Sequence, residues 1–224
     1  MPSFLITGRG RKNQTIMNET KDNYNQLYSD NEITFGGGKA EYIVRDVLKY
    51  KKEGSVLEIG AGEGRNSLFL AAQGFDVEAI DISDKGIGKL QKTAEKQGLK
   101  IKTEVIDIRS SFPDKNYDII ASTFVLHHLL RQEGLAVIGQ IKDQTNPGGI
   151  NVIASFTKEG DFYNDNPNTD KFYLDIGELK ELYKDWEVLE YSEERGIAFQ
   201  KKDDGSPMFN VSAKLLARKP PTNS

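Results

Sequence analysis

Three glycines at alternate positions, Gly60, Gly62 and Gly64, follow the apolar run 56–59 and precede a helical pattern. The arrangement is typical of a buried strand that turns sharply into a helix, because glycine tolerates the backbone conformations that a tight turn needs. Such a turn brings backbone N–H groups to the carboxyl edge of a sheet, where a partly anionic small ligand can approach them. The chain is therefore expected to form an α/β fold around a small-molecule site at this edge, with a ligand-free turn as the alternative.

Spacing and charge at this turn distinguish two classes of ligand. A dinucleotide site needs G-x-G-x-x-G, whose third glycine would fall at Arg65 and not at Gly64. A pyrophosphate would also lie beside Glu58 and Glu63, and like charges in a partly desolvated cleft cost free energy. S-adenosylmethionine carries a sulfonium and an ammonium with one carboxylate, so Glu58 could attract its cationic part while N–H groups of the turn bind the carboxylate. The turn therefore favours this methyl donor.

Composition narrows the class of protein. The 224 residues suit a single α/β domain, and 30 basic against 34 acidic residues give a net charge of −4, which offers no reason to expect a nucleic-acid partner. The absence of cysteine excludes disulfides, thiolate zinc sites and cysteine nucleophiles, and no metal-ligating constellation is visible. No apolar stretch approaches the roughly 18 residues of a membrane span or forms a signal peptide. We expect a soluble cytoplasmic protein without a membrane partner.

Hydrophobic periodicity predicts the order of elements. Residues 1–35 are polar without sustained periodicity, so we expect a mobile N-terminal segment and a possible lid, followed by one domain over 36–224. Strands are expected at 55–59, 76–80, 101–106, 119–122, 150–156, 186–192 and 208–217, the last two around a turn at 203–206. Helices are expected at 38–50, 65–73, around 87–94, at 132–144 and after Asp175. Ser83 or Asp84 is expected to cap the third of these helices, and Asp175 could cap the last.

An acidic residue follows the second expected strand at the same edge as the glycine turn. A carboxylate at Asp81 could accept two hydrogen bonds from a ribose diol, and Ile82 offers an apolar wall for an adenine. A helix cap is the alternative for Asp81, although Ser83 or Asp84 suits that place better.

Several blocks of sequence carry a family resemblance. The pattern E-x-G-x-G-x-G at 58–64 resembles motif I of the class I S-adenosylmethionine-dependent methyltransferases. The blocks 64–72, 145–149, 177–187 and 215–219 make the chain similar to the tellurite-resistance methyltransferases of the TehB type. The N-terminal segment lies largely outside this resemblance.

The resemblance implies a fold and a cofactor site. The fold would be a Rossmann-like, seven-stranded, mostly parallel sheet of order 3-2-1-4-5-7-6, with strand seven antiparallel and helices on both faces. S-adenosylmethionine would be converted to S-adenosylhomocysteine. Asp107 and Ile108 would hold the adenine, with a turn aspartate as the alternative. The expected cofactor-binding residues are Glu58, Gly60, Ala61, Gly62, Arg65, Asn66, Asp81, Ile82, Asp107, Ile108, Thr123 and Phe124.

The acceptor of the methyl group is the most open question. The region after 119–122 lacks the N-P-P-Y or D-P-P-Y tetrad that holds a base amine, which argues against a DNA amine methyltransferase. Family members thought to act on chalcogen oxyanions carry a His-Arg pair where this chain has Phe199-Gln200, and Phe and Gln suit a neutral acceptor better. Three alternatives stay open. The acceptor could be tellurite or selenite, or it could be a thiol, phenol or amine metabolite. The chain could also be a non-catalytic module that only binds S-adenosylmethionine.

Both histidines of the chain, His127 and His128, follow the fourth expected strand, beside the expected position of the methyl group. Either could act as a general base for a protonated acceptor, and polar residues at a helix start are the alternative. Tyr24 and Tyr28 could close over the cofactor or pack on the surface, and Arg195 could contact an anion or lie in solvent. The expected substrate pocket comprises Tyr24, Tyr28, Phe156, Tyr163, Arg195 and Phe199.

Overall fold

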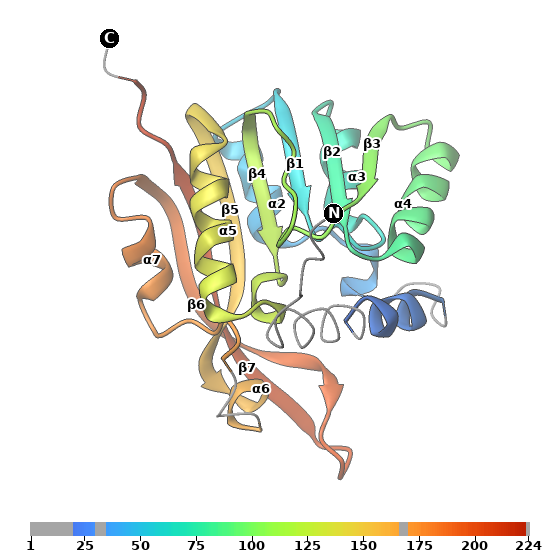
Figure 1. The fold of residues 1–224 in the computed structure, drawn as a ribbon, viewed down its shortest axis with the longest axis vertical. Helices are drawn as coiled ribbons and strands as arrows, with labels where there is room; N and C mark the ends of the chain where they lie inside the picture. Colours follow the sequence, from blue (N-terminus) through green and yellow to red (C-terminus); the bar gives the residue numbers. More distant parts are fainter. Residues whose placement is uncertain (1–19, 30–34, 166–169, 223–224) are drawn as a thin grey trace, which may run out of the picture.

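A seven-stranded sheet forms the centre of the computed structural model, which describes residues 20–29, 35–165 and 170–222, with Phe199 described by its backbone only. The strand order is β3-β2-β1-β4-β5-β7-β6 (Figure 1). The first five strands pair in parallel, whereas β7 pairs antiparallel with β5 and β6. The predicted strand order and the antiparallel seventh strand are confirmed. The strands are β1 Ser55–Ile59, β2 Asp76–Asp81, β3 Ile101–Val105, β4 Tyr117–Thr123, β5 Thr145–Gly160, β6 Glu187–Lys201 and β7 Pro207–Arg218.

The hairpin of β6 and β7 is longer than predicted and projects beyond the carboxyl edge of the parallel strands (Figure 1). The charged residues at 193–195 show no alternation of apolar and polar side chains, which is the pattern that predicts a strand. Glu194 nevertheless pairs with Ser212, and Arg195 with Val211, in the antiparallel ladder. Backbone hydrogen bonds hold an edge strand whatever its side-chain pattern. The strand predicted from the side-chain pattern at 186–192 therefore ends earlier than β6 does in the structure.

Helices cover both faces of the sheet. The helices are η1 Gly36–Gly38, α2 Tyr42–Asp46, η2 Val47–Lys49, α3 Arg65–Ala72, α4 Asp84–Lys96, η3 Leu126–His128, α5 Arg131–Asp143, α6 Asp161–Asn164 and α7 Glu178–Leu182. The single helix predicted over 38–50 is wrong, since the chain forms two short helices there, α2 and η2, after η1 ends at Gly38. Ser83 caps α4 as predicted, accepting the Gly86 N–H at 3.0 Å. The predicted cap of α7 is wrong, because Gly177, in a left-handed conformation, holds that position in place of Asp175.

Two apolar layers hold the helices to the sheet. On one face, α5 and α7 pack on β1 and β4 through a cluster that includes Leu57, Ile120, Ile138 and Tyr183. On the other face, α2 and α3 pack through a second cluster, and α4 adds a third beside it. Because both faces of the central strands are covered, these strands are almost continuously apolar, and their polar residues concentrate at the carboxyl edge.

Residues 20–29 form a helix at the carboxyl edge, which the polar sequence did not predict. Asn25 fastens this helix to the start of α4, since its Oδ1 accepts the Ser83 hydroxyl at 2.6 Å and its Nδ2 donates to Asp84 at 2.9 Å. Tyr28 is only 5% exposed. The remaining residues of the expected mobile segment, 1–19 and 30–34, lie outside the described residues. Within the described ranges, no helix has the length and apolar character needed to cross a membrane.

Candidate functional site

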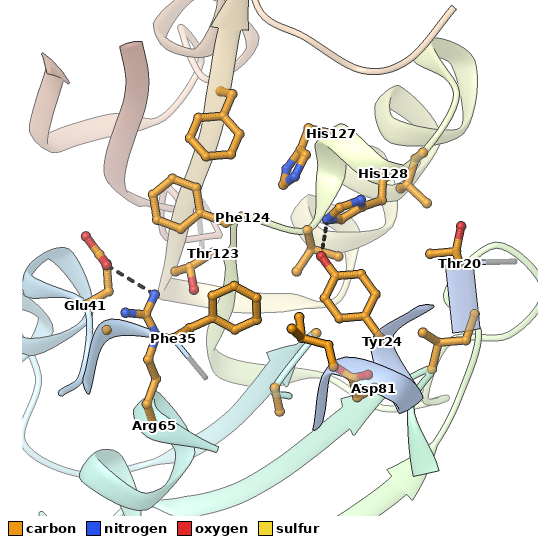
Figure 2. Close-up of a pocket in the computed structure, with 18 of the residues that line it drawn as sticks. Thr20, Tyr24, Phe35, Glu41, Arg65, Asp81, Thr123, Phe124, His127 and His128 are labelled. Carbon is orange, nitrogen blue, oxygen red and sulfur yellow. Dashed lines mark hydrogen bonds and ion pairs between the residues drawn. The ribbon is translucent and has the colours of Figure 1, made fainter. Parts of the chain in front are cut away.

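A cavity of about 900 Å³ opens at the carboxyl edge, where the glycine turn, β2, β4 and helix 20–29 meet (Figure 2). Its volume lies within the range of about 300 to 1,000 Å³ that small-molecule sites occupy. Most residues that the sequence proposed for a site line this one cavity. These residues are Tyr24, Tyr28, Glu58, Gly60, Ala61, Arg65, Asn66, Asp81, Ile82, Asp107, Ile108, Thr123, Phe124, His127, His128 and Phe156.

The glycine turn needs glycine for two separate reasons. Gly60 and Gly62 adopt φ angles of 71° and 56°, where other residues are strained. A Cβ on Gly60 would lie 2.1 Å from a methyl of Val125, and one on Gly62 would lie 2.3 Å from the Tyr28 hydroxyl. Val125, in the segment that follows β4, and Tyr28 of helix 20–29 therefore pack closely against the turn.

The N–H groups of this turn are already paired within the protein. Those of Gly60 and Ala61 donate to the carbonyl of Ile80 at 2.8 and 3.0 Å, and that of Gly62 donates to Asp81 at 2.8 Å. The expectation that these N–H groups bind a carboxylate is therefore not supported, because the turn folds back on the end of β2. Gly62 supports the site through Asp81 and does not itself line the cavity.

Glu58 is buried to 2% exposure at the end of β1. Its carboxylate accepts Nδ2 of Asn66 at 2.8 Å and the hydroxyl of Ser67, and Asn66 also donates to Thr123 at 3.1 Å. Burial raises the pKa of Glu58 to about 7, although these hydrogen bonds and the charge of Arg65 act in the opposite direction. Glu58 thus fixes the start of α3 and changes charge near neutral pH.

Asp81 and Asp107 lie at the ends of β2 and β3. Asp81 accepts N–H groups from Gly62 and Ser83, at 2.8 and 2.7 Å, which fixes the orientation of its carboxylate. Burial raises the pKa of Asp81, and these backbone hydrogen bonds oppose that rise. Asp107 is paired with Arg109 through two guanidinium nitrogens, the shorter contact being 2.8 Å. Both carboxylates are therefore held rigidly at the cavity wall.

Ion pairs hold another part of the wall. Arg65 lies 3.2 Å from Glu41 (Figure 2). Lys214 of β7 lies 2.9 Å from the same carboxylate. Glu41 also places its N–H 2.8 Å from Oδ1 of Asn66. The sequence analysis identified Arg65 but missed Glu41 and Lys214, since nothing at positions 41 and 214 indicates that the fold brings them together.

His128 faces helix 20–29, and His127 packs between His128 and Phe156. The imidazole rings of His127 and His128 lie 3.9 Å apart, and Nε2 of His128 lies 2.7 Å from the Tyr24 hydroxyl (Figure 2). Burial, together with the charge of Lys171, lowers the pKa of His128 to about 4 and that of His127 well below its usual value. Nδ1 of His127 is buried and has no hydrogen-bond partner in the described part of the chain. Both rings are therefore neutral at physiological pH.

Three phenylalanines form what we call the phenyl wall: Phe124, Phe156 and Phe162. Phe156 lies at its centre, 5.0 Å from the Phe124 ring, 5.1 Å from the Phe162 ring and 4.8 Å from the His127 ring. The backbone of Phe124 has a φ of 58°, which is strained for a residue other than glycine. Such strained residues cluster at functional sites, where the surrounding structure holds them in place.

Three residues predicted for the substrate pocket are not placed there by the structure. Tyr163 packs on Tyr173 at 5.5 Å and Arg195 lies 4.3 Å above the ring of Phe209, and neither lines the cavity. The side chain of Phe199 lies outside the described part of the structure. The cavity also contains residues that the sequence analysis did not propose for a site, among them Lys171, Ile197 and Asn210.

Comparison with known proteins identifies the family of this site. A family model described as "Tellurite resistance protein TehB" matches residues 20–212. The chain belongs to the TehB family. This match includes helix 20–29, which the sequence resemblance had left largely aside. No group of three or more potential metal ligands occurs among the described residues.

Relatives of this chain include a TehB sequence and a solved TehB structure. The chain is 38% identical over 176 residues to the probable S-adenosyl-L-methionine-dependent methyltransferase TehB of Haemophilus influenzae, covering 79% of this chain and 61% of that protein. The crystal structure of TehB from Haemophilus influenzae superposes with a TM-score of 0.72 at 34% identity, over 89% of this chain and 66% of that one. The N-methyltransferase NodS of Bradyrhizobium japonicum, at 18% identity and a TM-score of 0.67 over 90% and 98% of the two chains, shares the fold.

Proposed function

We propose that this TehB-family chain is an S-adenosylmethionine-dependent methyltransferase that acts on a small-molecule acceptor. The observation that carries the proposal is the convergence of Asp81, Asp107, Glu58 and Arg65 with the phenyl wall on one cavity at the carboxyl edge of the parallel strands. The chain spans 61% of the length of the TehB relative that is named a probable methyltransferase, so the activity comes to this chain as a proposal.

The residues of the cavity fit this methyl donor. Gly60 and Ala61 line the cavity, and because their side chains are absent or a single methyl, a flat nucleoside can approach the backbone of the turn. Acidic side chains on the wall suit a ligand with two positive charges and disfavour a pyrophosphate. The acidic residues of the wall are Glu41, Glu58, Glu63, Asp81 and Asp107.

Individual residues would hold different parts of the donor. Asp81 would accept the ribose hydroxyls, while Asp107, Ile108 and Ile82 would enclose the adenine. Arg65 is the cation placed to receive the carboxylate, since the N–H groups of the turn are paired. We assign the methyl-bearing end to the side of Thr123 and Phe124, where β4 ends.

The donor supplies a methyl group bonded to a positively charged sulfur, which makes that carbon electrophilic. The chain would therefore act chiefly by orienting the two reactants and excluding water. Helix 20–29 and the phenyl wall provide that exclusion from two sides, and the hydrogen-bonded carboxylates hold the orientation. No covalent intermediate with the protein is required.

Ligand binding and turnover test the proposal with the full chain. S-adenosylhomocysteine should raise the melting temperature, whereas NAD should not, because only a ligand that binds the folded state stabilises it. Formation of S-adenosylhomocysteine from the methyl donor should then be measured with tellurite, selenite, thiols, phenols and amines. Stabilisation by NAD and not by S-adenosylhomocysteine would reject the proposal, and binding without turnover on any acceptor would leave a non-catalytic binding module.

A further inference from the structure

We propose that the acceptor is an uncharged molecule with an apolar body and a weakly acidic O–H or S–H, that is, a phenol or a thiol, bound against the phenyl wall with its reacting group beside His127. This inference rests on the proposed function and narrows its substrate class.

The phenyl wall supplies the apolar surface. Phe124, Phe156 and Phe162 are each partly exposed and line the same cavity. Their rings meet at tilted or perpendicular angles, 37° between Phe124 and Phe156 and 88° between Phe156 and Phe162, which leaves ring faces and edges for a further apolar group. Burying apolar area against such a wall favours an acceptor with a hydrocarbon or aromatic body over a small, strongly hydrated ion.

Charge on the wall argues against an oxyanion. The guanidinium of Arg65 and the ammonium of Lys214 share the carboxylate of Glu41, and Arg109 is paired with Asp107. Arg65 is assigned above to the carboxylate of the methyl donor, and Lys214 and Arg109 are each paired with a carboxylate, so an anionic acceptor would have to compete for these cations. Next to the phenyl wall it would meet two neutral imidazoles in place of a cationic pair.

A basic amine is disfavoured at the same place. Burying an ammonium between the phenyl wall and two neutral imidazoles would cost free energy, because these groups carry no negative charge to pair with it. An amine would have to lose its proton before entering, whereas a phenol or thiol enters neutral.

Two buried polar atoms flank the phenyl wall without partners in the described part of the chain. They are Nδ1 of His127 and Nδ2 of Asn210, whose Oδ1 accepts the N–H of Phe162 at 2.9 Å. Buried polar atoms in native proteins are nearly always paired, so their lack of partners points to a ligand with polar groups at this wall.

The transfer balances with His127 as the proton acceptor. The oxygen or sulfur of the acceptor forms a bond to the methyl carbon with its own electron pair, while the bond from that carbon to the donor's sulfur breaks and its electron pair stays on that sulfur. The acceptor's proton passes to the neutral imidazole of His127 and then to water after product release. Burial lowers the pKa of His127, so its ring is neutral before the transfer, and the negative charge that develops on the acceptor during the transfer raises the proton affinity of the ring.

An acceptor panel tests the substrate class directly. Phenol, benzyl mercaptan, benzylamine, selenite and tellurite should be compared by S-adenosylhomocysteine formation and by calorimetric titration into the full chain loaded with S-adenosylhomocysteine. We expect binding and turnover with phenol or benzyl mercaptan and at least about tenfold lower kcat/KM with the other three. Turnover of selenite, tellurite or benzylamine at an equal or higher rate would overturn this inference while leaving the proposed function intact. A failure of S-adenosylhomocysteine to bind would instead reject the proposed function.

A pair of adjacent variants tests the phenyl wall. Phe162→Leu removes a ring that lines the cavity, whereas Tyr163→Phe alters a ring that packs on Tyr173 outside it. We expect Phe162→Leu to raise the KM of the phenol or thiol about tenfold with the KM of the methyl donor unchanged, and Tyr163→Phe to change neither. Equal acceptor KM values in the two variants would contradict the wall as the acceptor site. Thermal melting with S-adenosylhomocysteine verifies that each variant is folded.

The role of His127 has its own test. We expect His127→Gln to lower kcat with a phenol about 100-fold while binding of S-adenosylhomocysteine is retained, because glutamine cannot take up the proton. If the kcat of His127→Gln stays within twofold of that of the parent chain across pH 6 to 9, His127 is not the proton acceptor.

Discussion

The hydroxyl of Tyr24 lies 2.7 Å from Nε2 of His128, and this contact joins the N-terminal helix to the end of the fourth strand. Together with the bonds from Asn25 to Ser83 and Asp84, it fixes helix 20–29 across the cavity. The same helix carries Tyr28, whose hydroxyl packs against Gly62. The wall of the cavity is thus completed by a segment that precedes the sheet in sequence, so access to the site depends on that segment.

Replacing Tyr24 with phenylalanine should weaken this closure. The change removes the hydrogen bond and leaves a ring nitrogen of His128 unpaired, at a cost of about 1 to 2 kcal/mol. We expect faster amide exchange in 20–29 and weaker binding of S-adenosylhomocysteine, with strands β1 and β4 unaffected. Tyr50→Phe is the matched control, since the Tyr50 hydroxyl bonds to Glu190 away from the cavity. Equal exchange in both variants would show that Tyr24 does not hold the helix.

A comparison of alanine substitutions at Gly60 and Gly98 distinguishes the cost of backbone strain from the cost of steric crowding. Both adopt positive φ, 71° and 67°, but a Cβ on Gly98 meets open space, whereas one on Gly60 would overlap Val125. Gly98→Ala should therefore destabilise the fold by about 1 kcal/mol from strain alone. Gly60→Ala should cost about 2 to 4 kcal/mol and abolish binding of S-adenosylhomocysteine, because the turn must move. Urea unfolding and calorimetry measure the two effects, and similar losses in both variants would contradict crowding at Gly60.

Asp81→Asn tests a carboxylate that serves structure and ligand at once. An amide can accept only one of the two N–H groups, from Gly62 and Ser83, that Asp81 accepts now, and its own NH₂ would face the other donor. The free energy of unfolding should fall by about 1 to 3 kcal/mol, and affinity for S-adenosylhomocysteine should fall more than affinity for methionine alone. Asp76→Asn is the control, because Asp76 begins the same strand, is exposed and does not line the cavity. If Asp81→Asn binds S-adenosylhomocysteine as tightly as the parent chain does, Asp81 does not bind the ribose.

Local patterns predicted the sheet well because its central strands are buried on both faces. Residues 56–59 and 119–121 are continuously buried, or nearly so, and such runs are recognisable without a structure. The glycine turn and Ser83 were also predictable, since their conformation and capping depend on neighbouring residues only. The broken helix at 38–50 was not, because the split into α2 and η2 shows only in the folded backbone.

The site was predicted only in part, for a physical reason. Asp81, Asp107 and Thr123 end parallel strands, and topology alone brings such positions together. Glu41, Lys214 and Asn210 reach the cavity through tertiary packing across long sequence separations, which no local pattern records. The pairing of the turn's N–H groups with Ile80 and Asp81 likewise depends on how closely the turn folds back on β2.

Glu58 makes binding of the methyl donor depend on pH. Its pKa of about 7 lies above the ordinary value of 4.5, so the buried carboxyl gains charge only as pH rises through neutrality. A cationic ligand favours the charged form, and the dissociation constant of the donor should therefore fall between pH 6 and pH 8 by up to about tenfold per pH unit. The same raised pKa has the opposite effect on folding. Its stabilising contribution is complete below pH 4.5 and is lost as pH rises toward 7.

Glu58→Gln should remove both dependences. The oxygen of glutamine can accept the Asn66 amide, and its NH₂ can donate to the Ser67 hydroxyl, which accepts as well as donates, so the fold should persist. Relative to the parent chain, the variant should gain stability between pH 5 and pH 8, because it has no carboxyl to ionise in a buried place. Its affinity for the donor should be low and nearly independent of pH over the same range. Calorimetric titrations and urea unfolding at pH 6, 7 and 8 measure both quantities. A parent chain whose donor affinity is flat across this range, or a variant that keeps the parent's slope, would show that Glu58 does not sense the donor's charge.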